Sequence, residues 1–172
     1  ITPEDFPSAH PLAGIELQRQ LEANAFKIGG SNYCAPAQLV GDFMLDKPST
    51  KLGSVIPSYQ PGIKLGSLTE ALPKYAIDAI REAIPEFNKK IRGFSMKEAI
   101  FTGVETRSSS PVRLNRDPES YESINTHGFY PAGEGAGYAG GILSAGIDGI
   151  QVAEAVARSI LGLPHPVKVK NK

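Results

Sequence analysis

A glycine-rich stretch near the end of the chain restricts the fold more than any other feature of the sequence. Residues 133–141 contain five glycines, and a long apolar segment follows directly. Glycine has no Cβ, so backbone N–H groups can approach a ligand closely and positive φ angles are accessible. A helix that begins straight after such a loop presents unpaired N–H groups and the positive end of its dipole. The stretch is typical of an anion-binding loop, most often for phosphate; the plainer interpretation is a tight strand-to-helix turn.

Composition excludes several classes of protein. The 172 residues carry 18 basic and 18 acidic side chains, so no net charge favours binding to nucleic acid or to a membrane surface. No apolar run approaches the roughly 20 residues needed to span a bilayer. One cysteine, Cys34, and three scattered histidines predict neither a disulfide framework nor a metal site. We therefore expect a cytoplasmic protein.

The first residues do not resemble the start of a complete protein. The opening sequence ITPEDFP has no initiating Met, no basic region and no apolar core of a signal peptide. We expect the chain to be a piece of a larger protein.

The first half of the chain has mostly helical periodicity. Apolar spacing predicts a helix over residues 11–28, ended by Gly29-Gly30, and a second over 36–46. Prolines and glycines predict a loop at 47–66. A third helix should begin after a capping box at Ser67 and end at Gly93, with a kink or break caused by Pro85.

The second half is different and completes an α+β fold. Short strands are expected near 99–115 and at 128–132, and a long C-terminal helix over 141–161. The wide apolar arc of that helix predicts packing against a sheet or between two layers. We expect a mostly helical segment at 1–98, strands with the glycine loop and terminal helix at 99–162, and a tail at 163–172.

The glycine spacing matches a dinucleotide fingerprint in its letters only. Gly135, Gly137 and Gly140 have the G-x-G-x-x-G spacing, but the fingerprint requires a further strand and an acidic residue about 20 positions later. No Lys-Ser/Thr pair follows the glycines either, so a Walker-type phosphate loop is also excluded.

Two groups of side chains near this stretch are candidates for ligand contacts. Glu134 lies between glycines, where it either accepts hydrogen bonds from the hydroxyls of a ligand or complements the dipole of the following helix. Glu105 and Arg107 are two positions apart and would share a face of a strand, and Arg113 on a neighbouring strand would join them. The group would form either a clamp for a substrate carboxylate or a cross-strand salt-bridge ladder. Tyr138 either contacts a ligand or packs within the loop.

A family resemblance rests on two long segments and several shorter ones. The segments NTHGFYPAGEGAGYAGGILSAGIDGIQVAEAV and TGVETRSSSPVRL resemble the C-terminal part of uncharacterised bacterial FAD-dependent dehydrogenases, often described as NAD(FAD)-utilising. These are two-domain FAD/NAD(P)-binding flavoproteins. The upstream positions that share the resemblance are Ala25-Phe26, Gly29-Gly30, Tyr33, Ala35-Pro36-Ala37-Gln38 and Asp42-Phe43.

The resemblance implies a cofactor and a set of contacts. In such flavoproteins the carboxylate at the position of Glu134, beside Gly133, is expected to hydrogen-bond the ribityl chain of FAD. Backbone amides around Gly140, Gly141 and Ile142 are expected to face the flavin pyrimidine edge or the phosphates. The N-terminal FAD-binding segment, with its own glycine fingerprint, is missing from this chain and becomes an expected partner, together with an unknown small-molecule substrate.

The sequence therefore predicts the C-terminal part of an FAD-dependent oxidoreductase, inactive by itself. In such a piece the terminal helix should expose an apolar face or bury it in a homodimer contact. No side chain has the spacing of a catalytic acid or base. Two other functions remain open from the residues: a non-catalytic binding or scaffold module, and a stand-alone anion-binding domain that uses the glycine loop.

Overall fold

The computed structural model describes residues 1–107 and 109–164 and divides the chain into two compact units. One unit contains residues 17–106, and the other contains residues 1–16 together with the residues from 107 onward. Each unit is described by itself below. The expected tail at 163–172 lies outside the described residues from position 165 on.

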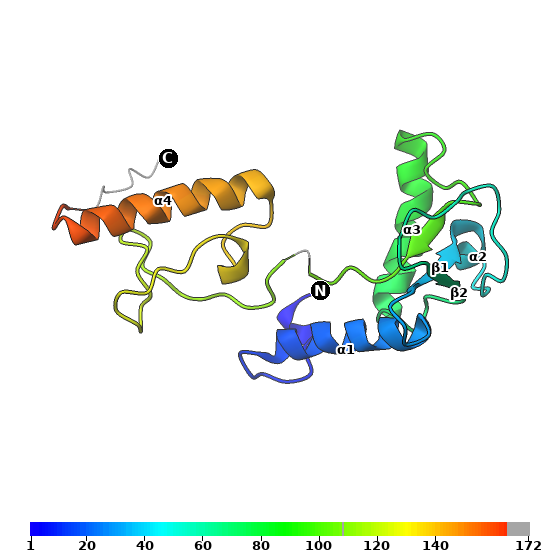
Figure 1. Cartoon of the computed structure of the whole chain (residues 1–172), viewed down its shortest axis with the longest axis horizontal. Helices are drawn as coiled ribbons and strands as arrows, with labels where there is room; N and C mark the ends of the chain where they lie inside the picture. Colours follow the sequence, from blue (N-terminus) through cyan, green and yellow to red (C-terminus); the bar gives the residue numbers. More distant parts are fainter. Residues whose placement is uncertain (108, 165–172) are drawn as a thin grey trace. The chain divides into compact units, whose positions relative to one another are not determined.

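The fold is a mixed α+β arrangement, as the sequence predicted. The helices are α1 (Ala13–Ile28), α2 (Val40–Met44), α3 (Lys74–Lys90) and α4 (Ile142–Ile160), with 3₁₀ turns η1 (Pro3–Asp5) and η2 (Glu134–Ala136) (Figure 1). The strands are β1 (Ala35–Leu39), β2 (Ile63–Leu65) and β3 (Ile100–Thr102). None of the helices in the described ranges is both long and apolar enough to cross a membrane.

The three strands form one small sheet in the unit of residues 17–106. The order is β2-β1-β3, with β1 parallel to β2 and antiparallel to β3. The prediction of a helix over residues 36–46 was wrong in its first half, because that part is strand β1. Three consecutive positions, 36–38, are buried, a pattern of a central strand covered on both faces rather than of a helix stripe.

Two further predictions in this unit need correction. The expected loop at 47–66 contains strand β2, whose three residues pair with β1 through backbone bonds that apolar patterning does not reveal. The third helix begins at Lys74 instead of after Ser67, and it continues through Pro85. Pro85 lies on an exposed face, where water can donate to the carbonyl oxygen that lacks a helical partner because proline has no N–H.

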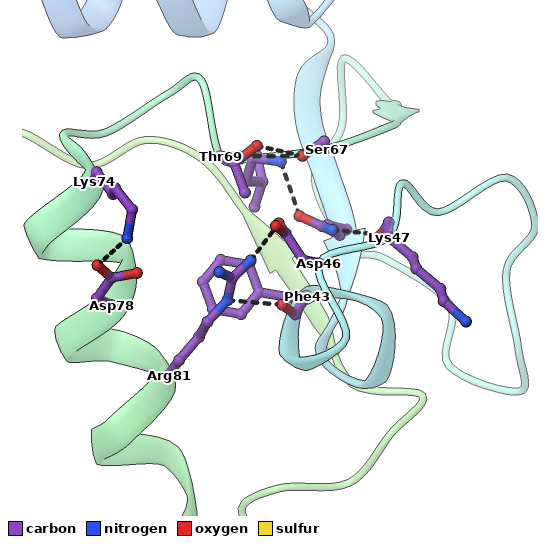
Figure 2. Close-up of polar contacts among 10 residues, drawn as sticks. Phe43, Asp46, Lys47, Ser67, Thr69, Lys74, Asp78 and Arg81 are labelled. Carbon is purple, nitrogen blue, oxygen red and sulfur yellow. Dashed lines mark hydrogen bonds and ion pairs between the residues drawn. The ribbon is translucent and has the colours of Figure 1, made fainter.

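The core of this unit lies between α2 and α3, with β3 at its border. Val40, Phe43, Ile77 and Ile84 form a buried apolar cluster. The Phe43 ring meets Phe101 edge to face at 5.1 Å between centroids. On α3, Arg81 lies over the Phe43 ring at 5.0 Å from its centroid, donates to the Phe43 carbonyl and pairs with Asp46 (Figure 2).

The other unit is built around α4, which runs close to the limits that the sequence predicted. Its inner side contributes Val152 and Ala155, which pack with Tyr121, while Tyr130 and Val156 border this cluster. The expected packing of this helix against a sheet is absent from the described part of the unit, because all three strands belong to residues 17–106.

The predicted strand at 128–132 is not formed. Its neighbourhood contains only isolated bridges, Arg116 with Ser123 and Ser123 with Thr126. Pro131 has no N–H to donate to a ladder. The Phe129 carbonyl accepts instead from Ser123 in a local turn.

The outer side of α4 is apolar and exposed. Ile142 and Leu143 are 94% and 82% exposed, and Ile147, Ile150 and Ile160 are also open to solvent. A Cβ added at Gly146 or Gly149 would meet no described atom within 4 Å. Uncovered apolar surface of this kind marks an interaction site.

Candidate functional site

Two glycines of the glycine-rich stretch are required by its backbone. Gly133 has φ +64° and ψ −155°, a combination that essentially only glycine adopts. Gly137 has φ +81°, and a Cβ there would lie 2.6 Å from the Val112 carbonyl oxygen. These two residues bracket η2 and give the loop its shape.

Of the other three glycines, Gly135 and Gly140 are not required by the described fold, whereas a Cβ at Gly141 would make a tight contact of 3.3 Å with Ser144 Oγ. Gly135, Gly140 and Gly141 lack positive φ angles. A Cβ at Gly135 would meet nothing within 4 Å, and at Gly140 it would make ordinary contact with Ser109 Oγ at 3.6 Å. All three are exposed, so a further group can approach their backbone closely.

A buried ion pair fastens this loop to α4. Arg116 Nη2 and Nη1 donate to the two carboxylate oxygens of Asp148 at 2.5 and 3.0 Å. The same carboxylate accepts the Gly133 N–H at 2.7 Å, and Arg116 also donates to the Pro131 carbonyl at 2.6 Å. Because both charged side chains are nearly enclosed and bidentate, the pair holds the loop to the helix with fixed geometry.

Tyr138 belongs to the same network. The Arg116 guanidinium lies 3.6 Å from its ring centroid, and Arg113 lies over the ring at 4.4 Å. The Tyr138 hydroxyl accepts the backbone N–H of Arg116 and donates to the Leu114 carbonyl. These contacts favour packing within the loop over a direct ligand contact, and they also place Arg113 beside the loop.

Glu134 and the start of α4 face solvent. Glu134 is half-buried in the first turn of η2, and within the described part of the chain its carboxylate makes no hydrogen bond or ion pair. Ser144 Oγ accepts the Gly141 N–H at 3.2 Å. The amides of Ile142 and Leu143 lie in the first turn, whose N–H groups have no carbonyl partner within the helix.

The strand pairing expected for the arginine group is absent. Residues 103–107 and 109–115 form no strand, because Pro111 lacks an N–H and the Leu114 N–H donates to Ala136 in the glycine loop. The prediction that Arg113 occupies a neighbouring strand was therefore wrong. Glu105 instead lines a cavity in the unit of residues 17–106.

Sequence reasoning missed the central ion pair. The sequence patterns described above single out neither Arg116 nor Asp148. One signal was available: Asp148 is an acidic residue with Ile147, Gly149 and Ile150 around it, where an unpaired carboxylate is costly.

No metal centre is apparent in the described ranges. No group of three His, Cys, Asp or Glu side chains there could hold a metal ion. His127 pairs with Glu122 at 2.7 Å but is almost fully exposed.

Comparison with known proteins assigns the family. Residues 1–108 match the model of the FAD-dependent protein, C-terminal domain-like family. The chain belongs to this family. An uncharacterised protein of Clostridium beijerinckii (strain ATCC 51743 / NCIMB 8052) is 58% identical over 156 residues, which cover 91% of this chain and 29% of that protein. The family match ends before the glycine-rich stretch, so membership and the loop are independent observations.

Proposed function

We propose that this chain forms the closing half of an FAD site in a longer FAD-dependent oxidoreductase. The observation that carries the proposal is the glycine loop, in which Gly135 and Gly140 leave backbone uncovered although the described fold does not require glycine there. Family membership and the exposed face of α4 support it further.

The residues present fit such a cofactor. Glu134 would accept hydrogen bonds from hydroxyls of the ribityl chain, and the amides of Gly140, Gly141 and Ile142 would donate to the pyrimidine edge or the phosphates. Gly133 lets the chain turn toward them, and the positive end of the α4 dipole favours negative charge at the ligand. FAD, when bound, supplies the redox chemistry, and the protein orients it.

The substrate contacts rest on fewer observations. Arg113 is exposed beside Tyr138, where its guanidinium would pair with a substrate carboxylate. Arg107 is proposed for the same clamp from its position in the sequence. We assign no catalytic acid or base.

The apolar face of α4 is proposed to meet the N-terminal FAD-binding segment of the longer protein. The face exposes several large aliphatic side chains, and the relative from C. beijerinckii extends well beyond the matched region. Apolar patches of this kind mark interaction sites. A homodimer through the same face is the competing arrangement, since it would cover the same side chains.

Flavin retention by the longer protein tests the cofactor proposal. Glu134→Ala should weaken retention roughly tenfold, because hydrogen bonds to a charged group contribute about 1.5–3 kcal/mol. The matched control is Glu119→Ala, an exposed carboxylate in the same unit. The ratio of flavin to protein absorbance measures both. Equal flavin content in the two variants would contradict the role of Glu134, and absence of flavin in the unaltered protein would favour a scaffold module.

Charge placed on α4 tests the partner proposal. Ile147→Asp with Ile150→Asp should abolish association with the separately produced N-terminal segment, whereas Ser159→Asp on the same helix should leave it intact. Sedimentation of each mixture measures the association. If the changes instead only convert a dimer of this chain to a monomer, the homodimer is the correct arrangement.

A further inference from the structure

A cavity of about 200 Å³ lies in the unit of residues 17–106, and no residue of the glycine loop lines it. Its walls are almost wholly apolar and come from α2, α3, β3 and the loop before α3. They include Phe43, Leu68, Leu72, Ile77, Ile80 and Phe101. We propose that this cavity is a binding site for one small, neutral aromatic ring.

The walls are fixed by buried polar contacts rather than by packing alone. Arg81, on α3, donates to the Phe43 carbonyl and lies over the Phe43 ring (Figure 2). Gln38, fully buried in β1, accepts the Leu68 N–H at 2.8 Å and donates to the Lys47 carbonyl at 2.7 Å. Walls held in this way keep the cavity open instead of letting it collapse, and a preformed apolar cavity lowers the entropic cost of binding.

The size of the cavity restricts what it can hold. An engineered cavity of about 150 Å³ lined by Leu, Ile and Phe stays dry and binds benzene. A cavity of about 200 Å³ is large enough for one ring with a small substituent or for indole, and too small for a flavin or a nucleotide. The apolar walls require that the occupant be apolar as well.

The apolar walls explain why the ring should be neutral, because burying an unpaired charge is costly. Thr102, the last residue of β3, lines the edge of the cavity together with Gly103, Val104 and Glu105, which follow it. The same four residues border a second hollow of about 360 Å³, which is wider and includes Tyr33 and Glu22. That second hollow provides a neighbouring surface for control variants.

Indole fluorescence tests the proposal directly, because the chain contains no Trp and adds no indole signal of its own. Titration of the chain into indole should produce a saturable shift of the emission to shorter wavelength. Ala71→Phe fills the cavity from a position that is 2% exposed and should weaken binding by at least about tenfold. Tyr33→Asn, in the second hollow, should leave binding unchanged, since Asn tolerates the positive φ of Tyr33. Indole-3-carboxylate should bind more weakly than indole.

Absence of a saturable shift, or equal affinity in both variants, overturns the proposal. If Ala71→Phe does not fold, methyl NMR of the unaltered chain with toluene decides: shifts concentrated at Leu68, Leu72, Ile77 and Ile80 support the site, and shifts elsewhere or none reject it. Loss of indole binding in the longer protein would also overturn the proposal, since it would mean that another segment fills the cavity. The site does not depend on FAD, so its failure leaves the flavin proposal unaffected, and failure of flavin retention leaves this site standing.

Discussion

The two units of this chain differ in the interactions within each of them: one relies mainly on apolar packing and the other on an enclosed ion pair. The unit of residues 17–106 has a small sheet, an apolar cluster around Phe43 and polar contacts at the edges of that cluster. The other unit has a small apolar cluster and a nearly enclosed ion pair between Arg116 and Asp148. The apolar side chains of Ile142, Leu143, Ile147 and Ile150 on α4 are exposed.

The difference concerns where each unit obtains its stability. Apolar burial is non-directional and tolerates small shifts, so the first unit depends on volume and packing. A buried ion pair stabilises only while both partners and their hydrogen bonds are present. The second unit therefore depends on a few atoms, and its uncovered apolar face leaves further burial to a partner.

The largest expected effect comes from Phe43→Ala, which attacks the apolar unit. Removing a ring that is 2% exposed should lower the free energy of unfolding by about 3–5 kcal/mol. Hydrogen exchange should rise in β1 and α3, and remain unchanged in α4. Phe94→Ala is the control, because Phe94 is much more exposed and should cost far less. Equal loss of protection in α4 would break the division into two independently held units.

Asp148→Ala makes the complementary change in the polar unit. It leaves the Arg116 guanidinium enclosed without its counter-ion and the Gly133 N–H without its acceptor, at a cost of about 3 kcal/mol. Exchange should rise in α4 and in the glycine loop while α3 stays protected. Glu154→Ala, in an exposed pair with Arg158 on the same helix, should cost about 0.5 kcal/mol or less. A similar cost for both variants would show that the enclosed pair is not what holds this unit.

Gly135 and Gly137 allow a comparison between a glycine that the backbone conformation requires and one that only leaves space open. Gly137→Ala meets a positive φ and the Val112 carbonyl oxygen, so it should destabilise the unit by about 1–3 kcal/mol. Gly135→Ala meets no described atom and should be nearly neutral for stability. Thermal unfolding of both variants measures the difference. A destabilising Gly135→Ala would mean that this glycine serves the fold rather than a ligand.

The smallest expected effect is a pH dependence in the apolar unit. The hydroxyl and the backbone N–H of Ser54 donate to the Glu98 carboxylate and lower its pKa below the ordinary value of 4.5. Since the folded pKa is the lower one, this contribution is complete above the unfolded pKa and is lost as pH falls through the folded pKa. An NMR titration of Glu98 should have its midpoint below 4.5, and Ser54→Ala should return it toward that value. A midpoint at or above 4.5 in the unaltered chain contradicts the contact.

Sequence patterns predicted the elements that have strong periodicity or clear stop signals. The long helix α4 and the end of α1 at Gly29-Gly30 follow from apolar spacing and glycine caps. Strand β1 was missed because a short buried run has no period that separates it from a helix. Strand β2 was missed because its three residues are specified by pairing with β1 rather than by their own pattern.

The candidate site was only partly accessible from sequence. Glycine density identified the loop, but only the backbone angles separate the glycines that the turn needs from those that leave space. The contact between Arg116 and Asp148 joins positions that are 32 residues apart, and local spacing does not reveal such a pair. Arg113 meets Tyr138 through the same folding of the chain.

The enclosed ion pair also has a consequence for how the sequences of relatives can vary at its two positions. A change at position 116 that removes the guanidinium leaves the carboxylate of Asp148 without its partner, and the reverse change is equally costly. Replacement of both by apolar residues of matching volume carries no such penalty. Positions 116 and 148 should therefore change together among relatives. The Gly133 N–H donates to the Asp148 carboxylate, so it should find another acceptor whenever that carboxylate is replaced.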